Sequence, residues 1–227
     1  MGRRTYGQFC GLARALELVG ERWSLLVVRD LVLGPKRFTD LQRGLPRIPA
    51  SILSTRLNEL EEAGVVRRRV LPQLDASVVY ELTEYGSELE PIVLELGLWG
   101  ARSLGRPDPG DAFTLDAAIL ALHATFRPDR AESVRVSFEI HFGPGPLVHA
   151  IVDGGVLKVS EGPYSDADLV VRLDGPVTPL LSGEVSAAQA VDDGLVRVTG
   201  EAALLELFQE LFHIPARPVR AVGLAIG

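Results

Sequence analysis

Residues 35–82 constrain the fold most tightly, because helix and strand patterns follow one another there with very short connections. A short helical pattern is followed by a turn between Pro46 and Pro49, then by a second helical pattern and two strand-like segments. We expect the helices at 37–45 and 50–63 and the strands at 65–71 and 78–82. This order predicts a winged helix-turn-helix, in which the second helix enters the major groove of DNA.

The second of these helices has two chemically distinct faces. Its apolar residues are expected to form a buried ridge: Ile52, Leu53, Leu57 and Leu60. Its short polar residues lie opposite and are the candidates for contacting DNA: Ser51, Ser54, Thr55 and Asn58. Hydroxyl and amide groups can bind base edges and phosphates, and an ordinary solvated face is the alternative. Arg56 borders the apolar ridge, where we expect a structural ion pair as much as a DNA contact.

Basic residues of the hairpin are candidates for phosphate contacts. Strand alternation places Arg67 and Arg69 on one face and Arg68 on the other. Arg37, at the start of the first helix, is a further candidate. Edge-strand charge that prevents aggregation is the alternative for the hairpin arginines. Three residues of the second strand share the face that is expected to pack inward: Val78, Tyr80 and Leu82.

An apolar stripe follows the hairpin, within a single helix expected at 84–104. Its members recur at spacings of three and four: Tyr85, Leu89, Ile92, Leu96 and Trp99. A helix beyond the wing has little left to cover in its own domain, so the stripe predicts a dimer interface. Docking onto the second domain is the alternative. Helices are also expected at 9–19 and 21–33, and the first should share in the dimer.

Residues 8–104 resemble the HxlR family of bacterial winged-helix regulators, relatives of the MarR group. The residues that carry the resemblance are Cys10, Ala13–Leu16, Gly20–Trp23, Arg29–Leu31, Gly34–Phe38, Leu41, Leu53, Arg56–Leu57, Glu59–Gly64, Tyr80–Thr83 and Gly86. The resemblance implies a dimer that binds inverted-repeat operator DNA. The chain departs from the family in two places: Pro49-Ala50 replaces the usual Ser-Pro, so the side-chain N-cap is missing, and the wing tip at 73–77 lacks a basic residue.

Cys10 is a candidate redox residue. In the resembled family a cysteine at this position can sense oxidants or electrophiles. Arg14 lies one turn later and a helix start is near, and both features lower a thiol pKa. The alternative is a small buried hydrophobic residue.

The second half of the chain predicts a separate α+β domain. A Gly- and Pro-rich linker at 105–110 divides domain 1–106, for DNA binding and dimerisation, from domain 111–227. Helices are expected at 113–126, 179–181, 187–191 and 201–212, and strands at 134–142, 147–152, 156–159, 168–173 and 195–199. Strands in this order suggest a mainly antiparallel sheet with segregated helices.

Residues 113–213 resemble the sterol carrier protein type 2 fold. The carrying residues are Ala167–Leu173, Leu180–Gly183, Ala187, Ala190, Asp193–Gly200 and Leu204–Phe212. The resemblance implies a tunnel for an apolar ligand. Its candidate lining residues, for which ordinary core packing is the alternative, are Phe126, Phe138, Phe142, Leu180, Leu204, Phe208, Leu211 and Phe212.

Charge and composition narrow the function classes. Residues 1–106 carry 15 basic and 13 acidic side chains, a net charge of +2, whereas residues 107–227 carry 8 and 17, a net charge of −9. The second domain should therefore not select a polyanion. A single cysteine excludes an internal disulfide, and His141 and His149 without a third ligand do not predict a metal site. We expect no enzyme, cofactor or membrane span, and a cytoplasmic location.

These patterns together predict a dimeric transcriptional regulator that binds operator DNA and is modulated by a small apolar ligand in its second domain. Two alternatives stay open: a carrier or scavenger of an apolar metabolite, and a thiol-based stress sensor acting through Cys10.

Overall fold

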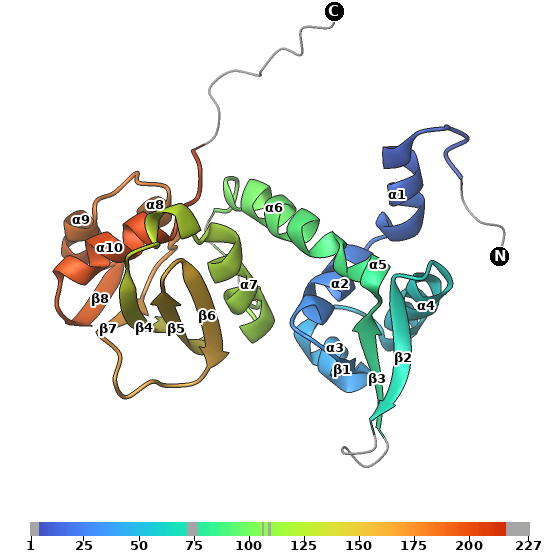
Figure 1. Cartoon of the computed structure of the whole chain (residues 1–227), viewed down its shortest axis with the longest axis horizontal. Coiled ribbons are helices and arrows are strands. Elements are labelled where there is room, and N and C mark those ends of the chain that lie inside the picture. The colour runs from blue at the N-terminus through green and yellow to red at the C-terminus, as the bar shows by residue number, and fades with distance from the viewer. Residues whose placement is uncertain (1–4, 72–76, 106, 109, 217–227) are drawn as a thin grey trace, which may run out of the picture. The chain divides into compact units, whose positions relative to one another are not determined.

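The computed structural model describes residues 5–71, 77–105, 107–108 and 110–216, and the chain divides into two compact units, Met1–Glu95 and Leu96–Gly227. Figure 1 shows the elements of each unit. The expected wing tip at 73–77 falls almost wholly outside the described residues, which resume at Ser77. Among the described helices, none is long and apolar enough to cross a membrane.

The first unit is a winged helix-turn-helix, as the sequence predicted. Its elements are α1 (Gly11–Val19), α2 (Ser24–Val32), β1 (Lys36–Arg37), α3 (Phe38–Gly44), α4 (Ala50–Glu62), β2 (Val66–Leu71), β3 (Ser77–Leu82), α5 (Glu84–Ser87) and the first half of α6 (Leu89–Ala101), which continues into the second unit from Leu96. The strands form an antiparallel sheet in the order β1-β3-β2. Its core is built from the apolar faces of α2, α3 and α4 and from the residues that lead into β2.

Two details of the expected packing in this unit are wrong. Ile52 is 38% exposed, whereas the rest of the expected ridge on α4 is fully buried. Val78 is 49% exposed. The buried side chains of β3 are instead those of Val79 and Glu81. Tyr80 and Leu82 do pack against the core. Val79 and Glu81 alternate with Tyr80 and Leu82 along β3, so side chains on both faces of this strand are at least partly buried.

The helix expected at 84–104 is divided into α5 and α6, and it ends at Ala101. Pro91 explains the division, because proline is tolerated in the first turn of a helix and disrupts a helix interior. Thr83 begins α5: its hydroxyl donates to the carbonyl of Gly64 at 2.6 Å and accepts from the N–H of Gly86 at 3.0 Å.

The second unit is a five-stranded sheet with helices. Beyond α6 its elements are α7 (Leu115–Thr125), the 3-10 turn η2 (Pro128–Arg130), β4 (Arg135–Phe142), β5 (Leu147–Asp153), β6 (Val156–Glu161), β7 (Leu169–Leu173), α8 (Thr178–Leu181), α9 (Ala187–Asp192), β8 (Val196–Gly200) and α10 (Ala203–Leu211). The strand order is β6-β5-β4-β7-β8. Only the β4–β7 pair among these described neighbours is parallel, so the sheet is mainly antiparallel.

One face of this sheet packs against the helices and forms the core of the unit. Phe138 of β4 is fully buried there, and its ring centroid lies 5.2 Å from that of Phe208 on α10. The opposite face carries polar side chains, among them Glu139, His141 and Arg172. This arrangement is the α+β architecture expected from the sequence.

Candidate nucleic-acid interface

The α4 helix presents the polar face that the sequence predicted. Leu53, Leu57 and Leu60 are fully buried beneath it. The four candidate DNA contacts are all exposed on the other side: Ser51, Ser54, Thr55 and Asn58. The hydroxyl of Thr55 donates to the carbonyl oxygen of Ser51 at 2.9 Å, which leaves its lone pairs able to accept from a base.

The start of α4 has no side-chain cap, because its N-cap residue is Pro49. The first backbone N–H groups of a helix have no partner within the helix and carry partial positive charge. The start of α4 is therefore favourable for an anion. Arg37 is the N-cap residue of α3, the first helix of the motif. Its backbone N–H donates to the carboxylate of Asp40 at 3.2 Å, and its side chain is exposed.

The hairpin arginines are exposed, and each is held by an acidic partner. Arg67 and Arg69 share the carboxylate of Glu81, at 2.7 Å and 2.9 Å, and Arg68 binds Glu61 of α4 at 2.7 Å. The predicted division of these arginines between the two faces is thus confirmed. Because the guanidinium groups are about half exposed, solvent screens these pairs and a phosphate can compete for the arginines.

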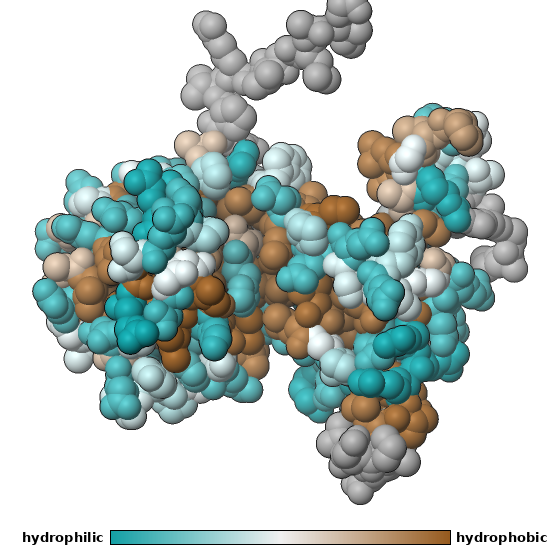
Figure 2. Space-filling view, viewed as in Figure 1, coloured by the Kyte–Doolittle hydropathy of each residue, from teal (hydrophilic) through white to brown (hydrophobic). Residues whose placement is uncertain are grey.

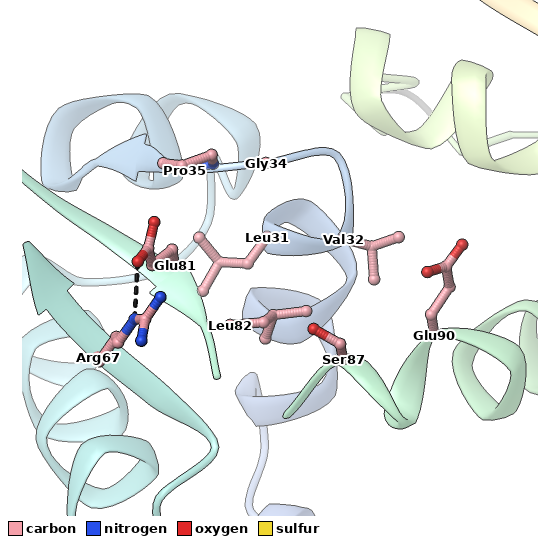
Figure 3. A pocket seen from close by; sticks show the side chains of 9 residues that line it. All are labelled: Leu31, Val32, Gly34, Pro35, Arg67, Glu81, Leu82, Ser87 and Glu90. Atoms are coloured by element: carbon pink, nitrogen blue, oxygen red, sulfur yellow. Dashed lines mark hydrogen bonds and ion pairs between the residues drawn. The ribbon is translucent and has the colours of Figure 1, made fainter. Parts of the chain in front are cut away.

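Glu81 holds two of the hairpin arginines, Arg67 and Arg69, in place. Figure 3 shows its carboxylate beside Arg67, at the wall of a cavity of about 230 Å³ that Leu31 of α2 and Ser87 of α5 also line. Only 10% of the Glu81 side chain is exposed. A carboxylate buried to this extent needs a charged partner, which is the physical reason that two arginines converge on it.

On the other face of the hairpin, Glu61 and Arg68 form an ion pair that shifts the pKa of both groups. Hydrogen bonding to the Arg68 guanidinium holds the pKa of Glu61 below its usual range. The same contact raises the pKa of Arg68 further. Both groups are therefore charged at neutral pH, and Glu61 masks one of the candidate phosphate contacts.

A second hollow, of about 420 Å³, lies along the other side of α4 and was not predicted. Arg56 stands in it with 13% of its side chain exposed and binds Glu59 at 2.6 Å and Glu21 at 3.4 Å, which confirms the expected ion pair. Trp23, also in the wall, has a φ of 82° and is the only non-glycine residue with a positive φ in the described part of the chain. Such a conformation costs about 1–3 kcal/mol and often marks a functional site.

The candidate dimer residues are mostly exposed within the chain. Tyr85, Ile92, Leu96 and Trp99 are 46% to 66% exposed, whereas Leu89 packs against the core of the first unit. The α1 helix adds Leu12 and Leu16, and Phe9 precedes it, all exposed. Figure 2 shows apolar surface over α1 and over α6.

The candidate ligand residues of the second unit fall into two groups. Five lie in the core and are at most 1% exposed: Phe138, Leu180, Phe208, Leu211 and Phe212. The other three are partly exposed at its margin: Phe126, Phe142 and Leu204. Phe126 contacts Phe212, with ring centroids 5.8 Å apart, whereas Phe142 contacts Phe113. The alternative of core packing holds for the first group.

Cys10 lies at the N-cap of α1 and is exposed, so the alternative of a buried hydrophobic residue is wrong. Hydrogen bonds from the backbone N–H groups of Ala13 and Leu12 hold the pKa of Cys10 below its usual range.

In the second unit, His141 binds Glu139 and Arg172, and His149 binds the carbonyl of Gly162. No metal-binding cluster occurs within the described ranges.

Comparisons with known proteins concern the N-terminal half of the chain. Residues 18–108 match the family model of HxlR-like helix-turn-helix proteins. Two relatives from Bacillus subtilis (strain 168) are HTH-type transcriptional regulators. YdeP is 35% identical over 103 residues, which cover 45% of this chain and 80% of YdeP. YodB is 38% identical over 97 residues, which cover 43% of this chain and 84% of YodB. The solved structure of reduced YodB from B. subtilis is 36% identical and covers 46% of this chain and 100% of that chain, with a TM-score of 0.38.

Proposed function

The chain belongs to the HxlR-like helix-turn-helix family of transcriptional regulators, and we propose that it binds operator DNA as a dimer through the polar face of α4. The observation that carries this proposal is the division of α4 into a fully buried ridge and an exposed face of short polar side chains. Such a face fits the major groove, where hydroxyl and amide groups can bind base edges.

The hairpin and the first helix of the motif complete the proposed interface. Arg67, Arg68 and Arg69 are the proposed phosphate contacts of the wing, and Arg37 is that of the α3 start. Phosphate contacts fix the position of the protein on DNA without reading its sequence. In this proposal sequence preference therefore belongs to α4, and the salt dependence of binding belongs mainly to the arginines.

An operator duplex selected from a random-sequence pool would test the interface. Ser54→Ala and Asn58→Ala should each weaken operator binding by about 1–3 kcal/mol for every base edge that the variant can no longer bind, with little effect on a non-specific duplex. Ser165→Ala, an exposed serine of the second unit, is the matched control. Wild-type operator affinity in both α4 variants would refute the assignment of α4.

For the dimer, the support is the exposed apolar surface of α1 and α6. The exposed members of the stripe, and Phe9 and Leu12 near the start of the chain, are large apolar side chains that nothing within the chain covers. Exposed apolar side chains that recur along one helix are typical of an interaction surface. A twofold dimer that covers this surface would present two α4 helices to the two halves of an inverted repeat.

For the second unit we propose binding of a small apolar molecule that biases DNA affinity. The resemblance of residues 113–213 to sterol carrier protein type 2 supports this, as does the partial exposure of Phe126, Phe142 and Leu204. Because the other candidates are closely packed, the ligand must enter by displacing side chains at the margin of the core. The effect on operator affinity should be about 1–3 kcal/mol, the usual size of such coupling.

Native mass spectrometry of the purified protein, followed by operator binding with and without any released compound, tests the ligand. A compound that changes operator affinity supports the proposal. A compound that binds the second unit and leaves operator affinity unchanged would instead support a carrier or scavenger of an apolar metabolite. Absence of any apolar compound, together with no binding from an apolar compound library, would refute both.

A thiol-based stress sensor is the second candidate function, and the exposed thiol of Cys10 at the start of α1 favours it. A lowered pKa increases the thiolate fraction at neutral pH, and the thiolate is the reactive form. Oxidant or electrophile should release operator DNA from the wild-type protein and not from Cys10→Ser. Equal release from both proteins would exclude this function.

A further inference from the structure

The hollow beside α4 combines an apolar floor with a rim of mainly basic side chains. Glu21 and Arg56 line it as an ion pair at 3.4 Å, and the Glu21 side chain is 46% exposed. Trp23, Pro49 and Ile52 provide the apolar surface, and Arg22 and Arg47 come from the turns before α2 and α4. These five residues are called the α4-flank hollow below. It lies on the side of α4 away from the hairpin, because Ile52, Arg56 and Glu59 share one side of the helix while Glu61 reaches β2 from the other.

One arginine of the hollow lies in its wall as part of an ion-pair cluster, and two lie exposed at its rim. The guanidinium of Arg56 is neutralised by Glu59 and Glu21, so it supports the wall of the hollow. Arg22 and Arg47 are exposed at the rim. The uncapped start of α4 at Pro49 adds backbone N–H groups with partial positive charge on the same side of the motif.

The backbone at Trp23 is held in a conformation that keeps the ring in this position. Its φ of 82° and ψ of −22° are left-handed, although the residue has a bulky side chain. The guanidinium carbon of Arg22 lies 5.2 Å from the ring centroid, a cation–π contact. Trp23 also packs against the core of the first unit. Core packing therefore fixes the ring, and the ring positions Arg22.

We propose that the α4-flank hollow binds the sugar–phosphate backbone of operator DNA beside the major groove that α4 enters. The deoxyribose lies against Trp23, Pro49 and Ile52, and the phosphate lies between Arg22 and Arg47. Apolar surface next to two arginines matches a backbone in which an apolar sugar alternates with an anion. This inference rests on the proposed function, since it adds a second line of backbone contact opposite the wing.

The first test is the salt dependence of operator binding. Arg22→Ala/Arg47→Ala removes two phosphate-binding side chains, so the slope of log K against log salt should become shallower by about 0.9 for each of them. Arg135→Ala/Arg197→Ala is the matched control, because it removes the same charge from exposed strands of the second unit. Equal slopes for the two double variants would overturn the inference.

The second test follows Trp23 directly. The chain has two tryptophans, so Trp99→Phe makes Trp23 the only one. Trp99 belongs to the proposed dimer stripe, so light scattering and operator titration first establish that Trp99→Phe is still a dimer that binds the operator. The emission of Trp23 should then change when the operator duplex binds. Inorganic phosphate at the same phosphate concentration should leave the emission unchanged, because an isolated anion lacks the sugar that contacts the ring. If inorganic phosphate alone changes the emission and DNA does not, the hollow is a small-anion site and the inference is wrong.

Ser54→Ala and Asn58→Ala, measured in parallel, separate this inference from the proposed function. Loss of operator affinity in those variants, with unchanged salt slope and Trp23 emission in the tests above, would refute the hollow and leave the proposed function standing. Failure of the wild-type protein to select any duplex would refute both.

Discussion

At the scale of single residues, two glutamates control how much positive charge the hairpin offers to DNA. Glu81 is nearly buried and orients Arg67 and Arg69, so it acts as a positioning residue. Glu61 is more exposed and pairs with Arg68 from α4. Removal of the first should disorder two arginines, whereas removal of the second should release one arginine for phosphate.

We therefore expect Glu61→Gln to strengthen non-specific DNA binding. The substitution removes a negative charge beside the DNA surface and frees Arg68, so the salt slope should steepen by up to about 0.9. Glu62→Gln, its exposed neighbour, is the control for the change in net charge alone. Gel-shift titrations at several salt concentrations measure the effect, and identical slopes for the two variants would contradict it.

A further residue-scale prediction concerns Glu139 in the second unit. Its carboxylate accepts a hydrogen bond from the N–H of Tyr164 at 2.8 Å and lies 2.7 Å from Nε2 of His141. Chiefly the Tyr164 bond, with the His141 contact, holds the pKa of Glu139 below its usual range. A depressed pKa contributes stability that is present above the unfolded-state value and is lost as the pH falls through the folded-state value.

The unfolding free energy of the wild-type protein should therefore fall more steeply than that of Glu139→Gln once the pH drops below about 4.3. Urea unfolding followed by circular dichroism at a series of pH values measures both curves. Glu161→Gln, an exposed glutamate of β6, should retain the wild-type acid dependence. Parallel curves for wild type and Glu139→Gln would show that these contacts do not contribute.

Sequence patterns predicted the polar face of α4 and the hairpin arginines, but they did not predict the α4-flank hollow. The period of α4 correctly separated Leu53 and Leu57 from the polar face. The same pattern placed Ile52 in the core, because periodicity records that a residue is apolar and not which neighbour covers it. The left-handed backbone of Trp23 has no local signal either, since tertiary packing imposes it on a residue that disfavours it.

At the scale of elements, the junction of α5 with the end of α4 depends on a glycine. A Cβ at Gly86 would overlap the carbonyl oxygen of Val65, which is backbone and cannot move aside. We expect Gly86→Ala to destabilise the first unit by about 1–3 kcal/mol. Gly97→Ala on α6, where a Cβ meets nothing within 4 Å, is the control and should be neutral or stabilising by up to about 1 kcal/mol. Thermal unfolding measures both, and equal melting temperatures would contradict the role of Gly86.

Helices and strands were predictable from the sequence where the hydrophobic period is sustained. The α7, β4 and α10 elements lie within the expected ranges, with ends shifted by one or two residues. The division between α5 and α6 could have been read from Pro91. The parallel pairing of β4 with β7 could not, because strand order depends on long-range contacts that alternation does not encode.

At the scale of the whole molecule, the charge is distributed unevenly along the chain. The second half carries a net charge of −9 and DNA repels it, so binding depends on the local arrangement of arginines in the first unit. A dimer strengthens such a weak attraction because two interfaces engage one operator together, and the second binding event becomes intramolecular. Operator affinity should therefore depend strongly on the oligomeric state.

The last prediction tests that dependence. Ile92→Glu/Leu96→Glu places two charges among the exposed apolar residues of α6, where burial in a dimer would leave them unpaired. We expect the variant to be monomeric by light scattering, to bind the operator far more weakly, and to keep the wild-type circular dichroism spectrum, because both side chains are exposed within the chain. Glu90→Lys changes charge on the same helix on the side away from the apolar stripe and should remain dimeric. A variant that is still a dimer would show that α6 does not form the interface, and the exposed residues of α1 would then be the next surface to examine.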